Sequence, residues 1–165
     1  MKTFNPKYSV LVLLMALISI SSQAQIAKAE IQATGLTCSM CSNAINKQLK
    51  SLAEVENVEI DLNSNTFTVT LKANNNVNPD FFKENVEKAG FFIGSLVLTV
   101  EPKTIAQKPY VVLDGKTKSA RPIEVQVLDK GYVTDKTFKK LSKSYKNSTT
   151  YNTSNEADFH VKITD

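Results

Sequence analysis

The chain has 165 residues, of which 42% are hydrophobic, and a formal net charge of +4. This length suits one domain or two small ones. Its two cysteines are too few for the disulfide framework that many small exported proteins carry.

The charges are divided unevenly along the chain. Residues 25–101 hold 6 Lys against 9 Asp plus Glu, a net of −3, whereas residues 102–165 hold 12 Lys plus Arg against 7 Asp plus Glu, a net of +5. This asymmetry predicts two units with different surfaces.

The first 24 residues have the features of a secretory signal. Lys2 and Lys7 precede an apolar run of 13 residues, 8–20, which is shorter than the roughly 20 residues that span a bilayer. Small residues follow this run up to Ala24, and we expect the signal to be cleaved after Ala24. The sequence therefore predicts an exported mature protein, residues 25–165, which would be periplasmic in a bacterium.

Residues 25–101 alternate between strand and helix patterns. Residues 45, 49 and 52 fall on one helical face, and Asn78, Pro79 and Gly90 are typical of a helix's cap, first turn and end. The predicted elements are a strand at 30–33, a helix at 42–53, strands at 58–62 and 67–71, a helix at about 79–89 and a strand at 96–100. This βαββαβ order predicts an α+β, ferredoxin-like domain with both helices on one face of an antiparallel sheet.

Residues 102–165 predict a small β-rich unit of order ββαβ. Its elements are strands at 110–113 and 123–127, a helix capped by Thr134 or Asp135, and a strand at 159–163. The helix is rich in lysine, so it could dock on an acidic partner or an anionic membrane surface, although a solvated face is the usual role of such a helix. His160 alternates with apolar neighbours, so we expect it to face outward. The unit is too poor in apolar residues to predict a separate core, and it could pack on the first unit or on a partner.

Both cysteines lie in the short stretch CSMC, residues 38–41, between the first strand and the first helix. Unpaired amides at a helix start favour the anionic thiolate. Two thiolates are too few for structural Zn²⁺, but they suit a soft ion such as Cu(I) or Hg²⁺. A redox dithiol is the rival interpretation, and a purely structural disulfide is the weakest because its loop is so small.

The run GLTCSMC, residues 35–41, within a βαββαβ unit resembles the GMTCxxC motif of the heavy-metal-associated domain family. That family includes copper chaperones, domains of copper-exporting ATPases and the periplasmic mercury-binding protein. The resemblance implies that Cys38 and Cys41 are metal ligands. Thr37 matches copper-type members, and Phe91 matches an aromatic position near the metal loop. Met40, between the cysteines, is either a third, thioether ligand or a side chain that points away.

We therefore expect an exported protein that binds Cu(I) and passes it to a metal donor or acceptor, a transporter or chaperone, by thiolate exchange. The alternatives are a Hg²⁺ carrier and a thiol–disulfide redox protein. No phosphate loop or Ser/His/Asp set occurs, so we do not expect an enzyme. Basic and aromatic residues are not interleaved, so we do not expect a nucleic-acid partner. Any membrane contact is expected to be peripheral.

Overall fold

The computed structural model describes residues 26–37, 39–116, 121–148, 150–151 and 157–164. The predicted signal at 1–24 and the predicted ligand Cys38 lie outside the described residues. The elements are β1 (Ile26–Thr34), α2 (Ser39–Lys50), β2 (Val55–Asp61), β3 (Thr66–Leu71), α3 (Pro79–Lys88), β4 (Phe92–Val100), α4 (Pro102–Ile105), β5 (Tyr110–Asp114), β6 (Ile123–Val127), α5 (Asp135–Ser144) and β7 (Phe159–Ile163). Within these described ranges, none of the helices has the length and the hydropathy that a membrane-spanning helix requires.

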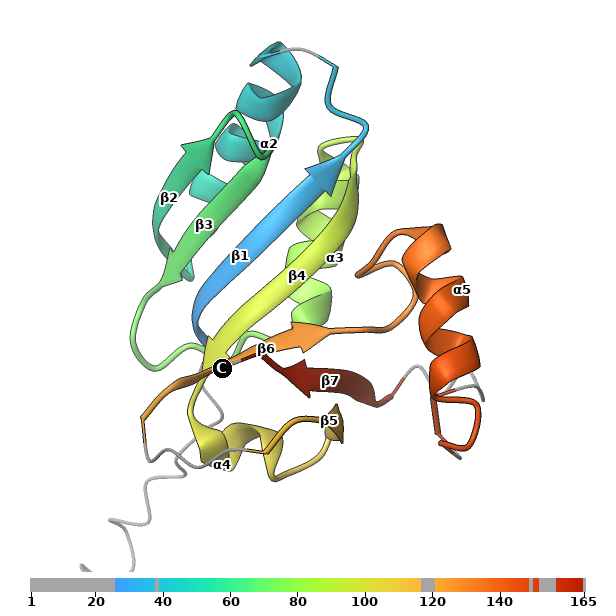
Figure 1. Ribbon diagram of the computed structural model, residues 1–165. Helices are drawn as coiled ribbons and strands as arrows, with labels where there is room; N and C mark the ends of the chain where they lie inside the picture. The colour runs from blue at the N-terminus through green and yellow to red at the C-terminus, as the bar shows by residue number, and fades with distance from the viewer. Residues whose placement is uncertain (1–25, 38, 117–120, 149, 152–156, 165) are drawn as a thin grey trace, which may run out of the picture.

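One seven-stranded sheet runs through the molecule in the order β2-β3-β1-β4-β6-β7-β5. Its first four strands are antiparallel neighbours, and α2 and α3 lie side by side on one face of them (Figure 1). This arrangement confirms the predicted α+β, ferredoxin-like βαββαβ fold.

Helix α3 begins and ends where local sequence signals place it. The Asn78 side chain accepts a hydrogen bond of 3.1 Å from the amide of Phe81, and Pro79 occupies the first turn, where no amide partner is needed. Gly90 follows the helix with a φ of 88°, a left-handed conformation that glycine adopts without strain. Phe82 and Val86 on the inner face are fully buried, so the helix is held chiefly by its packing on the sheet.

The basic C-terminal residues continue the sheet of the first unit. β6 pairs with the second half of β4, from Leu96↔Val127 to Val100↔Ile123, and β7 and β5 follow beside it. The predicted ββαβ order is present, with one addition, the short helix α4. The apolar side chains of β4 and β6 share one buried cluster, so the sparse apolar residues of this unit complete the core of the first.

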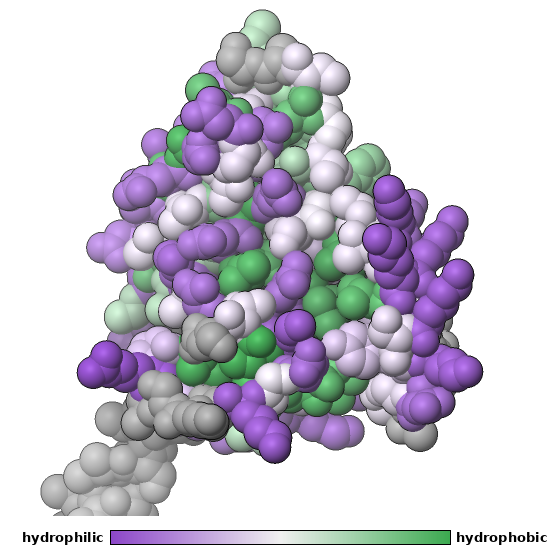
Figure 2. Space-filling view, in the orientation of Figure 1, coloured by the Kyte–Doolittle hydropathy of each residue, from purple (hydrophilic) through white to green (hydrophobic). Residues whose placement is uncertain are grey.

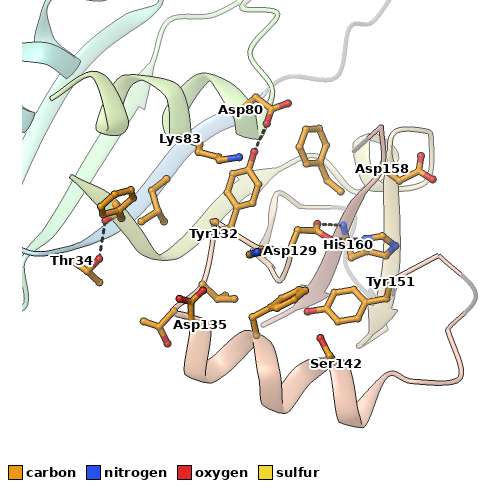
Figure 3. Close-up of a pocket in the computed structure, with 18 of the residues that line it drawn as sticks. Thr34, Asp80, Lys83, Asp129, Tyr132, Asp135, Ser142, Tyr151, Asp158 and His160 are labelled. Atoms are coloured by element: carbon orange, nitrogen blue, oxygen red, sulfur yellow. Dashed lines mark hydrogen bonds and ion pairs between the residues drawn. The ribbon is translucent and has the colours of Figure 1, made fainter. Parts of the chain in front are cut away.

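A second contact joins the C-terminal residues to α3. Tyr132 is only 3% exposed, and its hydroxyl donates a 2.5 Å hydrogen bond to a carboxylate oxygen of Asp80 in the first turn of α3 (Figure 3). Lys83, one turn further along α3, lies over the Tyr132 ring at 5.6 Å from its centroid. Burial, followed by the hydrogen bond to Asp80, raises the pKa of Tyr132 well above its usual value, so the hydroxyl remains a donor.

Candidate metal site

The metal loop begins where β1 ends. Thr34 pairs with Phe92 at the start of β4, and its hydroxyl donates a 3.3 Å hydrogen bond to the carbonyl of Phe92. Gly35 then turns the chain with a φ of 85°, a conformation in which a larger side chain would be strained. The loop is therefore anchored on the β1–β4 pair, and a glycine makes its first turn possible.

Phe91 is brought beside this turn by the end of α3. The amide of Gly90 donates to the carbonyl of Glu87, and the amide of Phe91 donates to the carbonyl of Val86, which is the paired bonding of a Schellman motif. Phe91 is half-buried against the core, and a Cβ placed on Gly35 would lie 4.0 Å from its ring. The aromatic residue implied by the family resemblance thus lies against the first residue of the metal loop.

Cys41 lies inside the first turn of α2. The helix was predicted from about residue 42 to 53; it lies three residues earlier, at Ser39–Lys50, which makes Cys41 its third residue. The Cys41 side chain is half-buried. Since the first amides of a helix lack intrahelical partners and carry partial positive charge, this position favours a thiolate, the form that binds a soft metal.

The remaining described residues of the loop differ in exposure. Leu36 is half-buried and packs against the core. Thr37 is exposed, and Met40 is 81% exposed. Thr37 and Met40, on either side of the cysteine stretch in sequence, are therefore accessible to an approaching partner, and the C-terminal unit does not cover them.

Among the described residues, which include Cys41 but exclude Cys38, no group of three or more His, Cys, Asp or Glu side chains could hold a metal ion.

The prediction that His160 faces outward was wrong. His160 is only 2% exposed, and its Nδ1 lies 2.7 Å from one carboxylate oxygen of Asp129 (Figure 3). Its Nε2 lies 2.9 Å from the Thr150 hydroxyl. Its backbone amide donates to the other Asp129 oxygen at 2.6 Å, and the Tyr151 ring packs edge-on against the imidazole. Burial raises the pKa of Asp129, and hydrogen bonds from His160 oppose that rise. His160 thus holds β7 against the segment that follows β6.

Comparison with known proteins places the metal loop in a family. Residues 30–92, from β1 to the start of β4, match the family of the heavy-metal-associated domain. Through this segment, the chain belongs to the heavy-metal-associated domain family.

Individual relatives each match less than half of this chain. A copper-transporting ATPase of Saccharomyces cerevisiae is 44% identical over 57 residues, which are 34% of this chain and 6% of the length of that ATPase. The solution structure of the yeast copper transporter domain Ccc2a is 36% identical, covers 41% of this chain and 90% of that domain, and superposes with a TM-score of 0.36. The N-terminal domain of a potential copper-translocating P-type ATPase from Bacillus subtilis, solved in the Cu(I)-loaded state, is 31% identical over 41% of this chain and 82% of that domain, with a TM-score of 0.36.

Proposed function

We propose that this protein binds Cu(I) through Cys38 and Cys41 and passes it to a partner by thiolate exchange. The observation that carries the proposal is a CxxC pair at the strand–helix junction of a heavy-metal-associated domain, with Cys41 in the first turn of α2. The similarity to part of a copper-transporting ATPase supports copper over other soft ions. The role is binding and transfer of the metal, without catalysis.

The exposure of Thr37 and Met40 supports the proposed transfer step. A thiolate of the partner adds to Cu(I) and forms a three-coordinate intermediate, after which one of the two original thiolates leaves. The exposure of Thr37 and Met40 allows the partner sulfur to approach without displacing the core. The partner is a metal donor or acceptor, either a transporter or a chaperone. Low coordination lets the ion be both tightly held and rapidly exchanged.

The deciding experiment is an anaerobic Cu(I) titration of reduced protein, residues 25–165, against a chromogenic chelator. We expect one tight equivalent, and none in the variant Cys38→Ser/Cys41→Ser. The matched control is Ser39→Ala/Ser42→Ala, which alters the same turn but keeps both thiols and should bind as the wild type does. Failure of the wild type to compete with the chelator would refute the copper proposal.

Two parallel measurements separate the alternative functions. A competition in which Hg²⁺ displaces Cu(I), together with induction of the protein by mercury, would assign it as a mercury carrier. Turnover with a thiol substrate, and a dithiol potential well above that of structural disulfides, would assign it as a redox protein.

Export is part of the proposal and rests on the basic and apolar residues of 1–24. N-terminal sequencing of the protein recovered from expressing cells should give Gln25 as the first residue. Retention of Met1 in the cytoplasmic fraction would contradict export.

A further inference from the structure

The exposed face of α5 carries a stripe of lysines. Lys136, Lys139, Lys140 and Lys143 stand at positions i, i+3, i+4 and i+7, a spacing that places them on one face of a helix. All four side chains are exposed, and Lys146 continues the row just beyond the helix. We call these five residues the lysine stripe. The only acidic residue of the helix is Asp135, in its first turn.

The opposite face of α5 is already occupied within the protein. Phe138 and Tyr145 are half-buried, and their rings lie 5.8 Å and 5.7 Å from the ring of Tyr151. The Tyr151 hydroxyl in turn donates a 2.6 Å hydrogen bond to the carbonyl of Leu128. Because its apolar side is half-covered by Tyr151 in this way, α5 lacks a fully exposed apolar face of the kind that inserts into a groove or a bilayer. A partner that binds the exposed face of α5 must therefore interact chiefly with its lysines.

The lysine stripe points away from the rest of the molecule. The salt bridges found among the described residues lie elsewhere, on Lys28, Lys88, Lys162 and His160. Figure 2 shows hydrophilic side chains projecting into solvent on the side of the molecule where Figure 1 places α5. These positive charges are therefore not neutralised by carboxylates of the described chain.

We propose that the lysine stripe docks the protein on a membrane surface that contains anionic phospholipid. Lysine is depleted in protein–protein interfaces, whose centres are formed by aromatic and other apolar side chains, and the stripe has no such centre. A planar layer of anionic headgroups requires only a row of exposed cations, each of which adds favourable binding free energy. The contact is peripheral, since nothing apolar enters the bilayer.

This docking is compatible with metal exchange. The loop that precedes α2 lies at one end of the sheet, whereas α5 lies beside the sheet (Figure 1). A molecule held by α5 would therefore keep Thr37 and Met40 exposed, and would search for its metal partner along the membrane surface.

The test is co-sedimentation of the metal-free mature protein with vesicles. One set contains phosphatidylcholine alone, and the other contains phosphatidylcholine with phosphatidylglycerol. We expect binding only to the anionic vesicles, with release by salt. The variant Lys139→Gln/Lys140→Gln/Lys143→Gln should lose affinity by about a hundredfold, given the contribution of each lysine near such a surface. The matched control is Lys50→Gln/Lys108→Gln/Lys116→Gln, which removes three exposed lysines elsewhere and should keep most of the affinity.

Several outcomes would overturn the proposal. One is the absence of wild-type binding to anionic vesicles at low salt. Another is an equal loss of vesicle affinity in both triple variants, which would show that binding depends on the net charge of the protein and not on the lysine stripe. Binding to poly-glutamate but not to vesicles would assign the stripe to an acidic protein. Circular dichroism of each variant checks that the fold is kept. Because the assay uses metal-free protein, its result is independent of the Cu(I) titration, and either proposal can fail without the other.

Discussion

Met40 lies directly before Cys41, and its thioether is chemically able to bind Cu(I). Its side chain is 81% exposed in the structure, however, so nothing in the packing directs it toward the cysteine pair. We therefore expect that Met40→Leu leaves the Cu(I) affinity unchanged in the chelator competition. Loss of affinity by about tenfold, or about 1.4 kcal/mol, would instead establish the thioether as a third ligand.

Tyr132 contributes a different kind of interaction, which joins the C-terminal residues to α3. Removing the hydroxyl in Tyr132→Phe leaves Asp80 without its 2.5 Å donor. Hydrogen bonds to charged groups contribute more than neutral ones, so we expect the free energy of unfolding to fall by about 2 kcal/mol in urea denaturation. The Cu(I) affinity should not change, since Tyr132 lies away from the metal loop.

The matched control for this prediction is Tyr110→Phe. Tyr110 is also buried, and its hydroxyl has no hydrogen bond to any residue that the structure describes, while desolvation by burial raises its pKa to about 12. Removing that hydroxyl should cost little stability at neutral pH. Equal losses in the two variants would show that the Tyr132–Asp80 bond contributes nothing specific.

At the scale of elements, the start of β4 and the end of β1 form the base of the metal loop. Gly94 lies at an irregularity between these strands, where the register shifts between Gln32 and Ala33. A Cβ at Gly94 would lie 2.5 Å from Cγ2 of Thr34, a stiff β-branched side chain. We expect Gly94→Ala to lower the free energy of unfolding by about 2 kcal/mol, because Thr34 must move to relieve the overlap.

A second substitution tests that cause. Thr34→Ala removes the clashing methyl group and loses only an exposed hydrogen bond to Phe92, so alone it should cost little. The double variant Gly94→Ala/Thr34→Ala should then regain most of the stability that Gly94→Ala loses. If the two losses simply add in urea denaturation, the overlap with Thr34 is not the cause.

The helices and strands also show which sequence signals are sufficient to predict where an element begins and ends. Both ends of α3 were predicted because Asn78, Pro79 and Gly90 act locally. The start of α2 was predicted three residues too late, since the apolar spacing that revealed the helix begins only at Ile45. The position of His160 was predicted wrongly, because its alternation with apolar residues was interpreted as a strand with one face in solvent.

That assumption fails at His160 because β7 lies inside the sheet, between β6 and β5, and the Tyr151 ring covers the face on which His160 lies. The partner Asp129 is 31 residues away in sequence, and no local pattern connects it with His160. The cysteine pair, in contrast, was found from a contiguous motif. Its use as a ligand pair remains a prediction, because Cys38 lies outside the described residues.

At the scale of the whole molecule, the charge division along the sequence does not correspond to two separate cores. The boundary at residues 101–102 falls between β4 and α4, yet β6 pairs with β4 and the apolar residues of both parts form one cluster. Strands that share a ladder and a core are expected to unfold together. The acidic and basic halves should therefore behave as one cooperative unit.

The tyrosines offer a direct test of this cooperativity. In residues 25–165 they are Tyr110, Tyr132, Tyr145 and Tyr151, and all lie after residue 101. Tyrosine fluorescence thus reports the C-terminal half and, through Tyr132, its contact with α3, whereas far-ultraviolet circular dichroism reports the whole fold. We expect the two urea transitions to coincide.

Metal binding gives a second test of whether the two halves unfold together. A ligand that binds only the folded state stabilises it, by about 2.7 kcal/mol at a free concentration one hundred times its dissociation constant. If the sheet unfolds as a unit, Cu(I) bound at the β1–α2 loop must raise the urea midpoint of both unfolding transitions equally. These are the transition followed by tyrosine fluorescence and the one followed by circular dichroism. The variant Cys38→Ser/Cys41→Ser should show no shift in either signal. The opposite result would be a tyrosine fluorescence midpoint that Cu(I) does not change, together with a circular dichroism transition in two steps. It would mean that the two halves fold independently despite their shared sheet.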